Sequence, residues 1–184
     1  MCLFFNKFKQ RIVSLLSLLT CEYKNMKNLP LIVKILICVV VCLAIGGLSG
    51  IATTDAIPNW YANVNKPSFN PPNWLFAPVW TALYSMMGVA AALVWHNKDA
   101  KSGVKAALII FAVQLLLNGL WSLLFFGMQN PPLAFVEIVI LWIAIVLCIR
   151  AFLPISKVAG YLLIPYLLWV SFASVLNLSI WLLN

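Results

Sequence analysis

Trp-Tyr-Ala-Asn-Val-Asn-Lys-Pro-Ser-Phe-Asn-Pro-Pro-Asn-Trp-Leu-Phe-Ala-Pro-Val-Trp, residues 60–80, is the stretch that decides the fold, because it interrupts a chain of long apolar runs. It contains four prolines, three tryptophans and one lysine. A proline lacks a backbone donor and moves the preceding residue toward extended geometry, which excludes Lys66-Pro67 and Asn70-Pro71-Pro72 from a helix interior. The stretch therefore predicts a stiff, ordered loop that leads into the first turn of a helix, where proline is tolerated.

The composition on either side of this stretch is that of a membrane protein. Of the 184 residues, 64% are hydrophobic and 9% are charged, and the mean hydropathy is +1.03. A soluble domain of this size cannot bury so much apolar surface. The net charge of +8 does not indicate nucleic-acid binding, because the basic residues lie at the ends of apolar runs instead of on a polar domain. We expect a lipid bilayer as the partner and no nucleic acid.

Five apolar runs are each long enough, at about 20 residues, to cross ~30 Å of hydrocarbon as a helix. The predicted spans are residues 31–53, 73–95, 104–126, 133–152 and 158–183. No strand-like alternation occurs, so the predicted fold class is an all-α integral membrane protein with a bundle of five transmembrane helices over residues 29–184. Gly46-x-x-x-Gly50 in the first span indicates either a close helix approach or only the high glycine content of membrane helices.

Residues 1–28 form an N-terminal extension that is difficult to assign to this bundle. Five basic residues surround a short apolar run, residues 12–19, which is too short to cross a bilayer. Three interpretations stay open: an amphipathic surface helix, a targeting segment, or an upstream start codon in front of a native start at Met26. We base no function on this region.

The distribution of basic residues predicts the orientation in the membrane. Eleven of the twelve Lys and Arg residues fall on the side of the N-terminus, and only Lys66 falls on the other. By the positive-inside rule, the N-terminus is cytoplasmic, whereas the loop at residues 60–72 and the C-terminus are outside. We expect a multi-pass protein of a bacterial inner membrane.

Polar and aromatic residues recur at helical spacing on three of the predicted spans. They are Trp80, Tyr84 and Met87-Gly88 on the second span, Gln114, Asn118, Trp121 and Phe125 on the third, and Trp169, Ala173 and Asn177 on the fifth. Amides are costly in hydrocarbon and usually face a partner or a cavity. For Gln114 and Asn177 we favour interhelical hydrogen bonds. For Asn118, one turn from Trp121, two interpretations stay open: packing of the aromatic side chains, or a pocket for a flat amphipathic ligand.

Together these residues resemble the motif of the TspO/MBR family, which comprises the translocator proteins or peripheral-type benzodiazepine receptors. The resemblance covers residues 30–184, is closest to bacterial members, and is carried by Trp60-Tyr61, Lys66-Pro67, Pro71-Pro72, Trp74, Phe76, Pro78, Trp80, Leu83-Tyr84, Met87-Gly88, Gln114, Asn118, Trp121, Phe125-Phe126-Gly127, Pro165-Tyr166, Trp169, Phe172-Ala173 and Leu176-Asn177. It implies a tryptophan-rich sensory or translocator protein that binds porphyrins such as protoporphyrin IX under the loop, forms homodimers and requires no cofactor. The ligand contacts that it implies are Trp60, Trp80, Tyr84, Asn118, Trp121, Trp169 and Ala173.

Two further functions follow from the same resemblance. Some bacterial members degrade protoporphyrin in light, which implies photochemical, catalytic roles for Trp60 and Trp169. A transporter of tetrapyrroles or sterols is the other alternative, although the odd helix number and the absence of an inverted repeat weigh against it. Residues 173–182 lack the Tyr and the following basic residue of the animal cholesterol motif, so we expect weak or no cholesterol recognition.

Other chemistry has little support in the sequence. Glu137 near one end of the fourth span is either an intramembrane functional acid or a helix-end residue, and Lys66 is a candidate partner for it. His96, the single histidine, is expected at a membrane interface and not on a haem. No CxxC pair, Ser/His/Asp set or phosphate loop is present, and we expect no metal site. We interpret as small core residues the cysteines Cys2, Cys21, Cys38, Cys42 and Cys148.

Overall fold

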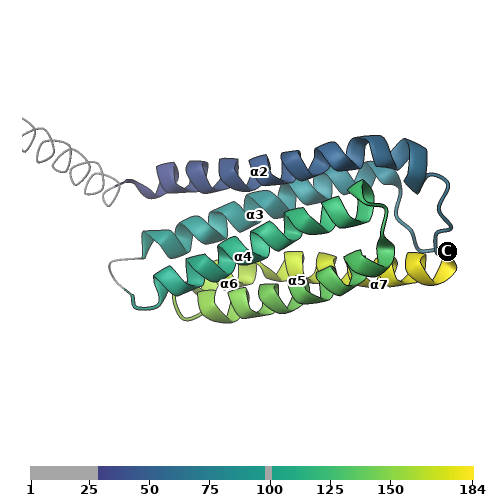
Figure 1. Cartoon of the computed structure of the whole chain (residues 1–184). Helices are drawn as coiled ribbons and strands as arrows, with labels where there is room; N and C mark the ends of the chain where they lie inside the picture. Colours follow the sequence, from purple (N-terminus) through teal and green to yellow (C-terminus); the bar gives the residue numbers. More distant parts are fainter. Residues whose placement is uncertain (1–28, 98–100) are drawn as a thin grey trace, which may run out of the picture.

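The computed structural model describes residues 29–97 and 101–184, and within these ranges it contains helices and no strand (Figure 1). The predicted N-terminal extension, residues 1–28, lies outside the described residues. The helices are α2 (Leu31–Ala56), α3 (Phe76–His96), α4 (Val104–Ser122), α5 (Pro131–Phe152), α6 (Lys157–Leu162) and α7 (Ile164–Leu183). Shorter elements are the π-helical turns Ile57–Tyr61 and Leu123–Gly127 and the 3₁₀ turn Asn73–Leu75.

Five helical stretches in the described part of the chain are long and apolar enough to cross a membrane. They are Leu31–Ile51, Asn73–His96, Val104–Gly127, Pro131–Phe152 and Lys157–Leu183. The prediction of an all-α membrane protein with five spans is therefore confirmed. Helices place their backbone hydrogen bonds within the segment, which is the requirement that the hydrocarbon imposes.

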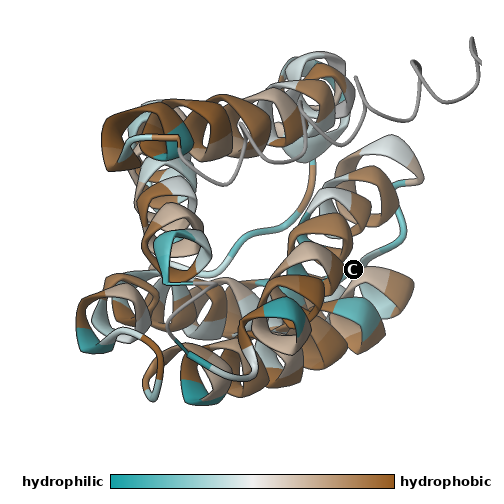
Figure 2. Cartoon of the chain, turned by 90° about the vertical axis from the view of Figure 1, so that its left-hand side faces the viewer, coloured by the Kyte–Doolittle hydropathy of each residue, from teal (hydrophilic) through white to brown (hydrophobic). Residues whose placement is uncertain are grey.

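The helices close into a ring in which each one packs against its neighbours (Figure 2). The helix α2 contacts α3 and α4, α4 contacts α5, α5 contacts α6 and α7, and α6 contacts α3. The loop after α2 and the C-terminus lie at the same end of the bundle, here called the loop end (Figure 1). Residues far apart in sequence thus meet at one end of the protein.

Two helix boundaries differ from the predicted ones. The first helix runs past residue 53 and continues through the turn Ile57–Tyr61, so Trp60 and Tyr61 end a helix instead of opening the loop. The fifth span breaks at Leu163 between α6 and α7. Pro165 explains this break, because its ring clashes with the carbonyl four residues earlier and it has no N–H to donate.

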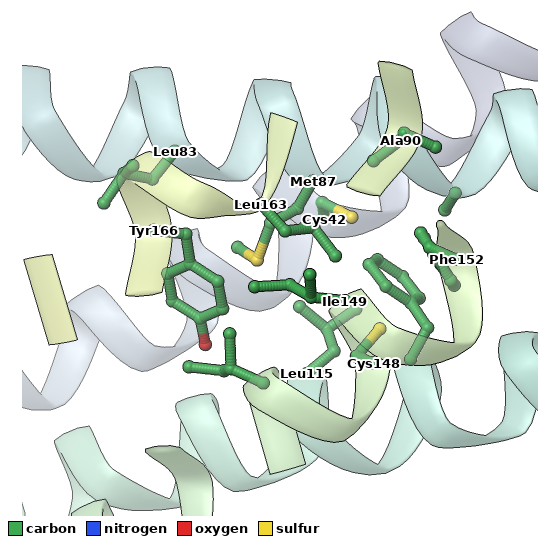
Figure 3. Close-up of a cluster of buried hydrophobic side chains, with 14 of the residues drawn as sticks. Cys42, Leu83, Met87, Ala90, Leu115, Cys148, Ile149, Phe152, Leu163 and Tyr166 are labelled. Carbon is green, nitrogen blue, oxygen red and sulfur yellow. The ribbon is translucent and has the colours of Figure 1, made fainter. Parts of the chain in front are cut away.

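The core away from the loop end is closely packed, and a glycine allows α3 to approach α2. A Cβ atom on Gly88 would lie 2.5 Å from the Cα atom of Val39. Cys42, Met87 and Cys148 lie among apolar side chains there, in agreement with the interpretation of these cysteines as core residues (Figure 3). A Cβ atom on Gly50, by contrast, would meet no atom within 4 Å, so the Gly46-x-x-x-Gly50 spacing is not a helix contact at Gly50.

The loop between Tyr61 and Asn73 is held at both of its ends by side-chain hydrogen bonds. The Lys66 Nζ donates to the carbonyl oxygens of Tyr61 at 2.5 Å, of Val64 at 2.8 Å and of Ala62 at 3.2 Å. An ammonium group at the carboxyl end of a helix satisfies free carbonyls and interacts favourably with the helix dipole. The Tyr61 hydroxyl donates to Asn70 Oδ1 at 2.6 Å.

The same loop is also attached to the last residue of the chain. The Asn65 backbone N–H donates to Asn184 Oδ1 at 3.0 Å, and Asn184 Nδ2 donates to the Asn65 carbonyl at 3.1 Å. This pair of bonds joins positions that are 119 residues apart. The order of the loop thus depends on contacts within its own sequence and also on a residue at the far end of the chain.

We predict that Lys66→Met lowers the thermal stability of the protein. The substitution keeps the length of the side chain but leaves three carbonyls without their shared charged donor, at a cost of about 1–3 kcal/mol. Thermal unfolding in detergent measures the effect. Lys105→Met, which removes an exposed cation from the opposite end of the bundle, is the matched control. Equal melting temperatures for the two variants would show that Lys66 does not cap the helix.

Candidate functional site

A cavity of about 410 Å³ lies between the loop-end halves of α2 and α3. One wall belongs to α2 and, apart from Leu43 at its inner end, contains small and hydroxyl-bearing residues, namely Gly46, Gly47, Ser49, Gly50, Thr53 and Thr54. The facing wall contains Phe76, Trp80 and Tyr84 of α3 and the turn before it. Small side chains opposite large rings leave this space open, because the rings fill only one side of it.

A second, smaller cavity of about 30 Å³ adjoins the first and is mostly aromatic. Its walls include Trp80, Trp121, Phe125, Trp169, Phe172, Ala173 and Asn177. Both cavities are lined by Tyr61, Phe76, Trp80 and Phe126. These four residues therefore form the partition between a roomy cavity at α2 and α3 and a nearly filled one toward α4 and α7.

Trp80 occupies the centre of this partition and contacts rings on both sides. Its ring centroid lies 5.6 Å from that of Tyr84 with the planes at 33°, and 6.4 Å from that of Trp169 with the planes at 88°. It also meets Tyr166 edge-on at 6.4 Å. Edge-to-face and offset pairs at these distances are favourable arrangements of aromatic rings.

A chain of buried hydrogen bonds runs behind the aromatic walls. The Tyr84 hydroxyl donates to Asn118 Oδ1, and Asn118 Nδ2 donates to the Tyr166 hydroxyl at 2.9 Å. The chain joins α3, α4 and α7. Asn118 is only 2% exposed, and both ends of its amide are used. It therefore positions Tyr84 and Tyr166 and lines neither cavity.

The other two amides behave largely as interhelical hydrogen-bonding groups. Trp121 Nε1 donates to Asn177 Oδ1 at 3.1 Å, and Asn177 Nδ2 donates to the Pro131 carbonyl at 2.8 Å. Gln114 Nε2 lies 4.0 Å from the sulfur of Met87. The contacts of Asn177 agree with the interhelical interpretation, and Asn177 in addition reaches the smaller cavity. Gln114 makes only the long contact to the α3 sulfur, and its buried Oε1 has no partner among the described residues.

The structure brings most of the expected ligand contacts to one region. Trp80, Trp121, Trp169 and Ala173 line the smaller cavity, and Trp80 and Tyr84 line the larger one. Trp60 lines neither of them, because it lies in the turn Ile57–Tyr61 and packs edge-on against Phe125 with centroids 5.5 Å apart. Trp60 and Trp169 therefore do not line a common cavity in this arrangement.

Sequence reasoning missed the α2 wall of the larger cavity. The Gly46-x-x-x-Gly50 spacing points to only two of these residues, and it predicts a helix contact instead of a cavity wall. The available signal was the recurrence of small residues at three- and four-residue steps, at Gly46, Ser49, Gly50, Thr53 and Thr54. In a membrane helix that pattern usually indicates helix packing, so it did not distinguish a cavity wall from a helix contact.

Charged groups take no part in either cavity, as far as the described lining residues extend. Glu137 is 5% exposed, and neither of its carboxyl oxygens has a hydrogen-bond partner among the described residues. The hypothesis that it pairs with Lys66 is wrong, because the Lys66 ammonium donates to three backbone carbonyls. His96 ends α3 at the far end from the loop, and the described residues contain no cluster of three or more metal-binding side chains. The site is thus suited to an apolar ligand.

Comparison with known proteins identifies the family of this chain. The model of the TspO/MBR family matches residues 38–182. The tryptophan-rich protein TspO of Chlorobaculum tepidum is 48% identical over 153 residues, which are 83% of this chain and 97% of that protein. The protein of the same name from Archaeoglobus fulgidus is 46% identical over 156 residues, which are 83% of this chain and 98% of that protein. The Homo sapiens translocator protein is 37% identical over 125 residues, which are 66% of this chain and 73% of that protein. The chain belongs to the TspO/MBR family.

Proposed function

We propose that this protein is a tryptophan-rich sensory or translocator protein of the membrane that binds porphyrins such as protoporphyrin IX. The observation that carries the proposal is the pair of adjoining cavities divided by Trp80. Flat apolar ligands favour such aromatic walls, and ligand pockets typically measure ~300–1,000 Å³. The larger cavity, at about 410 Å³, falls in this range. A tetrapyrrole occupies it with one face against the Trp80 ring.

The lack of charge in the lining sets the orientation of such a ligand. Buried carboxylates are costly without a cation or several donors. The described lining residues offer no cation, and Lys66 is occupied by backbone carbonyls. The porphyrin ring thus enters the cavity, whereas its carboxylates stay at the loop end, where Asn73 lies at the rim among exposed residues.

Two alternatives use the same cavities. Light-dependent porphyrin degradation needs an oxidisable side chain near the ligand, and Trp169 packs against the Trp80 ring that lines the larger cavity, whereas Trp60 lines neither cavity. Transport of tetrapyrroles or sterols needs a path through the bundle. We favour binding over both, expect a homodimer, and expect little cholesterol recognition, since residues 173–182 lack tyrosine and any basic residue.

We predict that Trp80→Ala and Asn118→Ala weaken protoporphyrin IX binding, and that Gln114→Ala does not. The first removes the ring between the cavities, and the second releases Tyr84 and Tyr166 from their shared amide. Each loss corresponds to about 1–3 kcal/mol. Titration of the purified protein, followed by porphyrin absorbance, gives the dissociation constants. The melting temperature of each variant is measured alongside, so that unfolding is not mistaken for lost binding. A loss confined to Gln114→Ala would contradict the proposed site.

We also propose that the loop end faces outward from the cytoplasm of a bacterial cell, with the N-terminus inside. Ser68 is an exposed residue of the loop, and Lys105 is exposed at the opposite end. In a chain without Cys2 and Cys21, we predict that Ser68→Cys reacts with a membrane-impermeant maleimide in intact cells, whereas Lys105→Cys reacts only after permeabilisation. The reverse pattern would show that the orientation is inverted.

A further inference from the structure

Of the three glycines that line the larger cavity, Gly46 alone lies directly against the side chain of another residue. A Cβ atom built on it would come within 2.9 Å of three ring atoms of Tyr84, a spacing that real Cβ atoms do not tolerate. Gly47 and Gly50 line the same cavity from the same helix, but a Cβ atom on either would meet nothing within 4 Å. The Tyr84 ring therefore sits in a notch in α2 that exists because residue 46 has no side chain.

The Tyr84 ring is held in this notch from the other side as well. Its hydroxyl donates to Asn118 on α4, and it is 6% exposed. Trp80 lies against it at 5.6 Å between ring centroids. The ring thus reaches from α2 to α4 and, with Leu43, forms the inner end of the larger cavity, which extends from there toward the loop end.

The packing around Tyr84 decides where the ring would go if the notch were filled. On the side away from the loop end it meets the closely packed core, in which Cys42 is 1% exposed and Met87 is fully buried (Figure 3). Close-packed cores yield little to an added methyl group. On the other side lies the empty space of about 410 Å³. A side chain at position 46 would therefore displace the ring into the cavity and carry Trp80 with it.

We infer that Gly46 sets the depth of the ligand cavity, because it supplies the notch that holds the Tyr84 ring out of the space a tetrapyrrole would occupy. Gly46 acts through Tyr84 and is a positioning residue. The part of this inference that concerns the ligand rests on the proposed porphyrin binding, whereas the part that concerns the notch does not. A methyl group at position 46 closes the inner end of the cavity, and the same group at position 47 or 50 only adds to its wall.

The test compares three substitutions on one helix, Gly46→Ala, Gly47→Ala and Gly50→Ala, in two backgrounds. The backgrounds are the native chain and Tyr84→Leu, which removes the ring that occupies the notch. For each purified protein the dissociation constant for protoporphyrin IX and the melting temperature in detergent are measured. Because the comparison is a double-mutant cycle, any direct loss from Tyr84→Leu itself cancels.

We expect Gly46→Ala to weaken protoporphyrin IX binding at least tenfold and to lower the melting temperature in the native background. Gly47→Ala and Gly50→Ala should change the dissociation constant by less than threefold. In the Tyr84→Leu background the three alanine variants should become alike in both measurements. The disappearance of the Gly46→Ala effect in this background would show that the effect depends on the Tyr84 ring. A general effect of alanine on helix packing would persist in the Tyr84→Leu background.

Two results would overturn the inference. The first is a Gly46→Ala variant that binds protoporphyrin IX and melts like the Gly47→Ala variant. The second is a loss at position 46 that persists in the Tyr84→Leu background. If the native protein binds no protoporphyrin IX, the proposed function and the ligand part of the inference both fail. The melting temperatures then still decide whether Tyr84 occupies a notch at Gly46.

Discussion

The chain of hydrogen bonds from Tyr84 through Asn118 to Tyr166 is the interaction on which the arrangement of the site depends. Inside a bilayer an amide without partners is costly, so Asn118 fixes the spacing of the helices that satisfy it. It joins α3, α4 and α7, and it holds two tyrosine rings that both contact Trp80. The aromatic walls are therefore positioned by a polar side chain that does not line either cavity itself.

The cavity between α2 and α3 results from the uneven size of the residues along their contact. At Gly88 the missing side chain lets the α2 backbone come close, and at Gly46 it admits the Tyr84 ring. Nearer the loop end the small residues of α2 face no ring that reaches them, as the free space beside Gly47 and Gly50 shows. Glycine thus allows close packing in one half of the contact and leaves an opening in the other.

The loop over this end of the bundle is ordered by polar contacts, in spite of its many prolines. Prolines limit the backbone, but they also remove donors, and the remaining groups must find partners. Lys66 satisfies carbonyls at the end of the first helix, and Asn65 bonds with Asn184. The loop is therefore attached to α2 on one side and to α7 on the other, and these helices contribute to the walls of the larger and the smaller cavity, respectively.

The sequence by itself determined the fold class and the set of aromatic residues. Apolar runs of membrane length leave helices as the way to satisfy the backbone, and helical spacing showed that Trp80 shares a face with Tyr84, and Asn118 with Trp121. Only the tertiary structure decided which of these residues line a cavity. Trp60 points to Phe125, Lys66 to carbonyls, and Gly46 to a tyrosine ring. Periodicity reports the face of one helix, whereas a cavity depends on the sizes of side chains that meet from several helices.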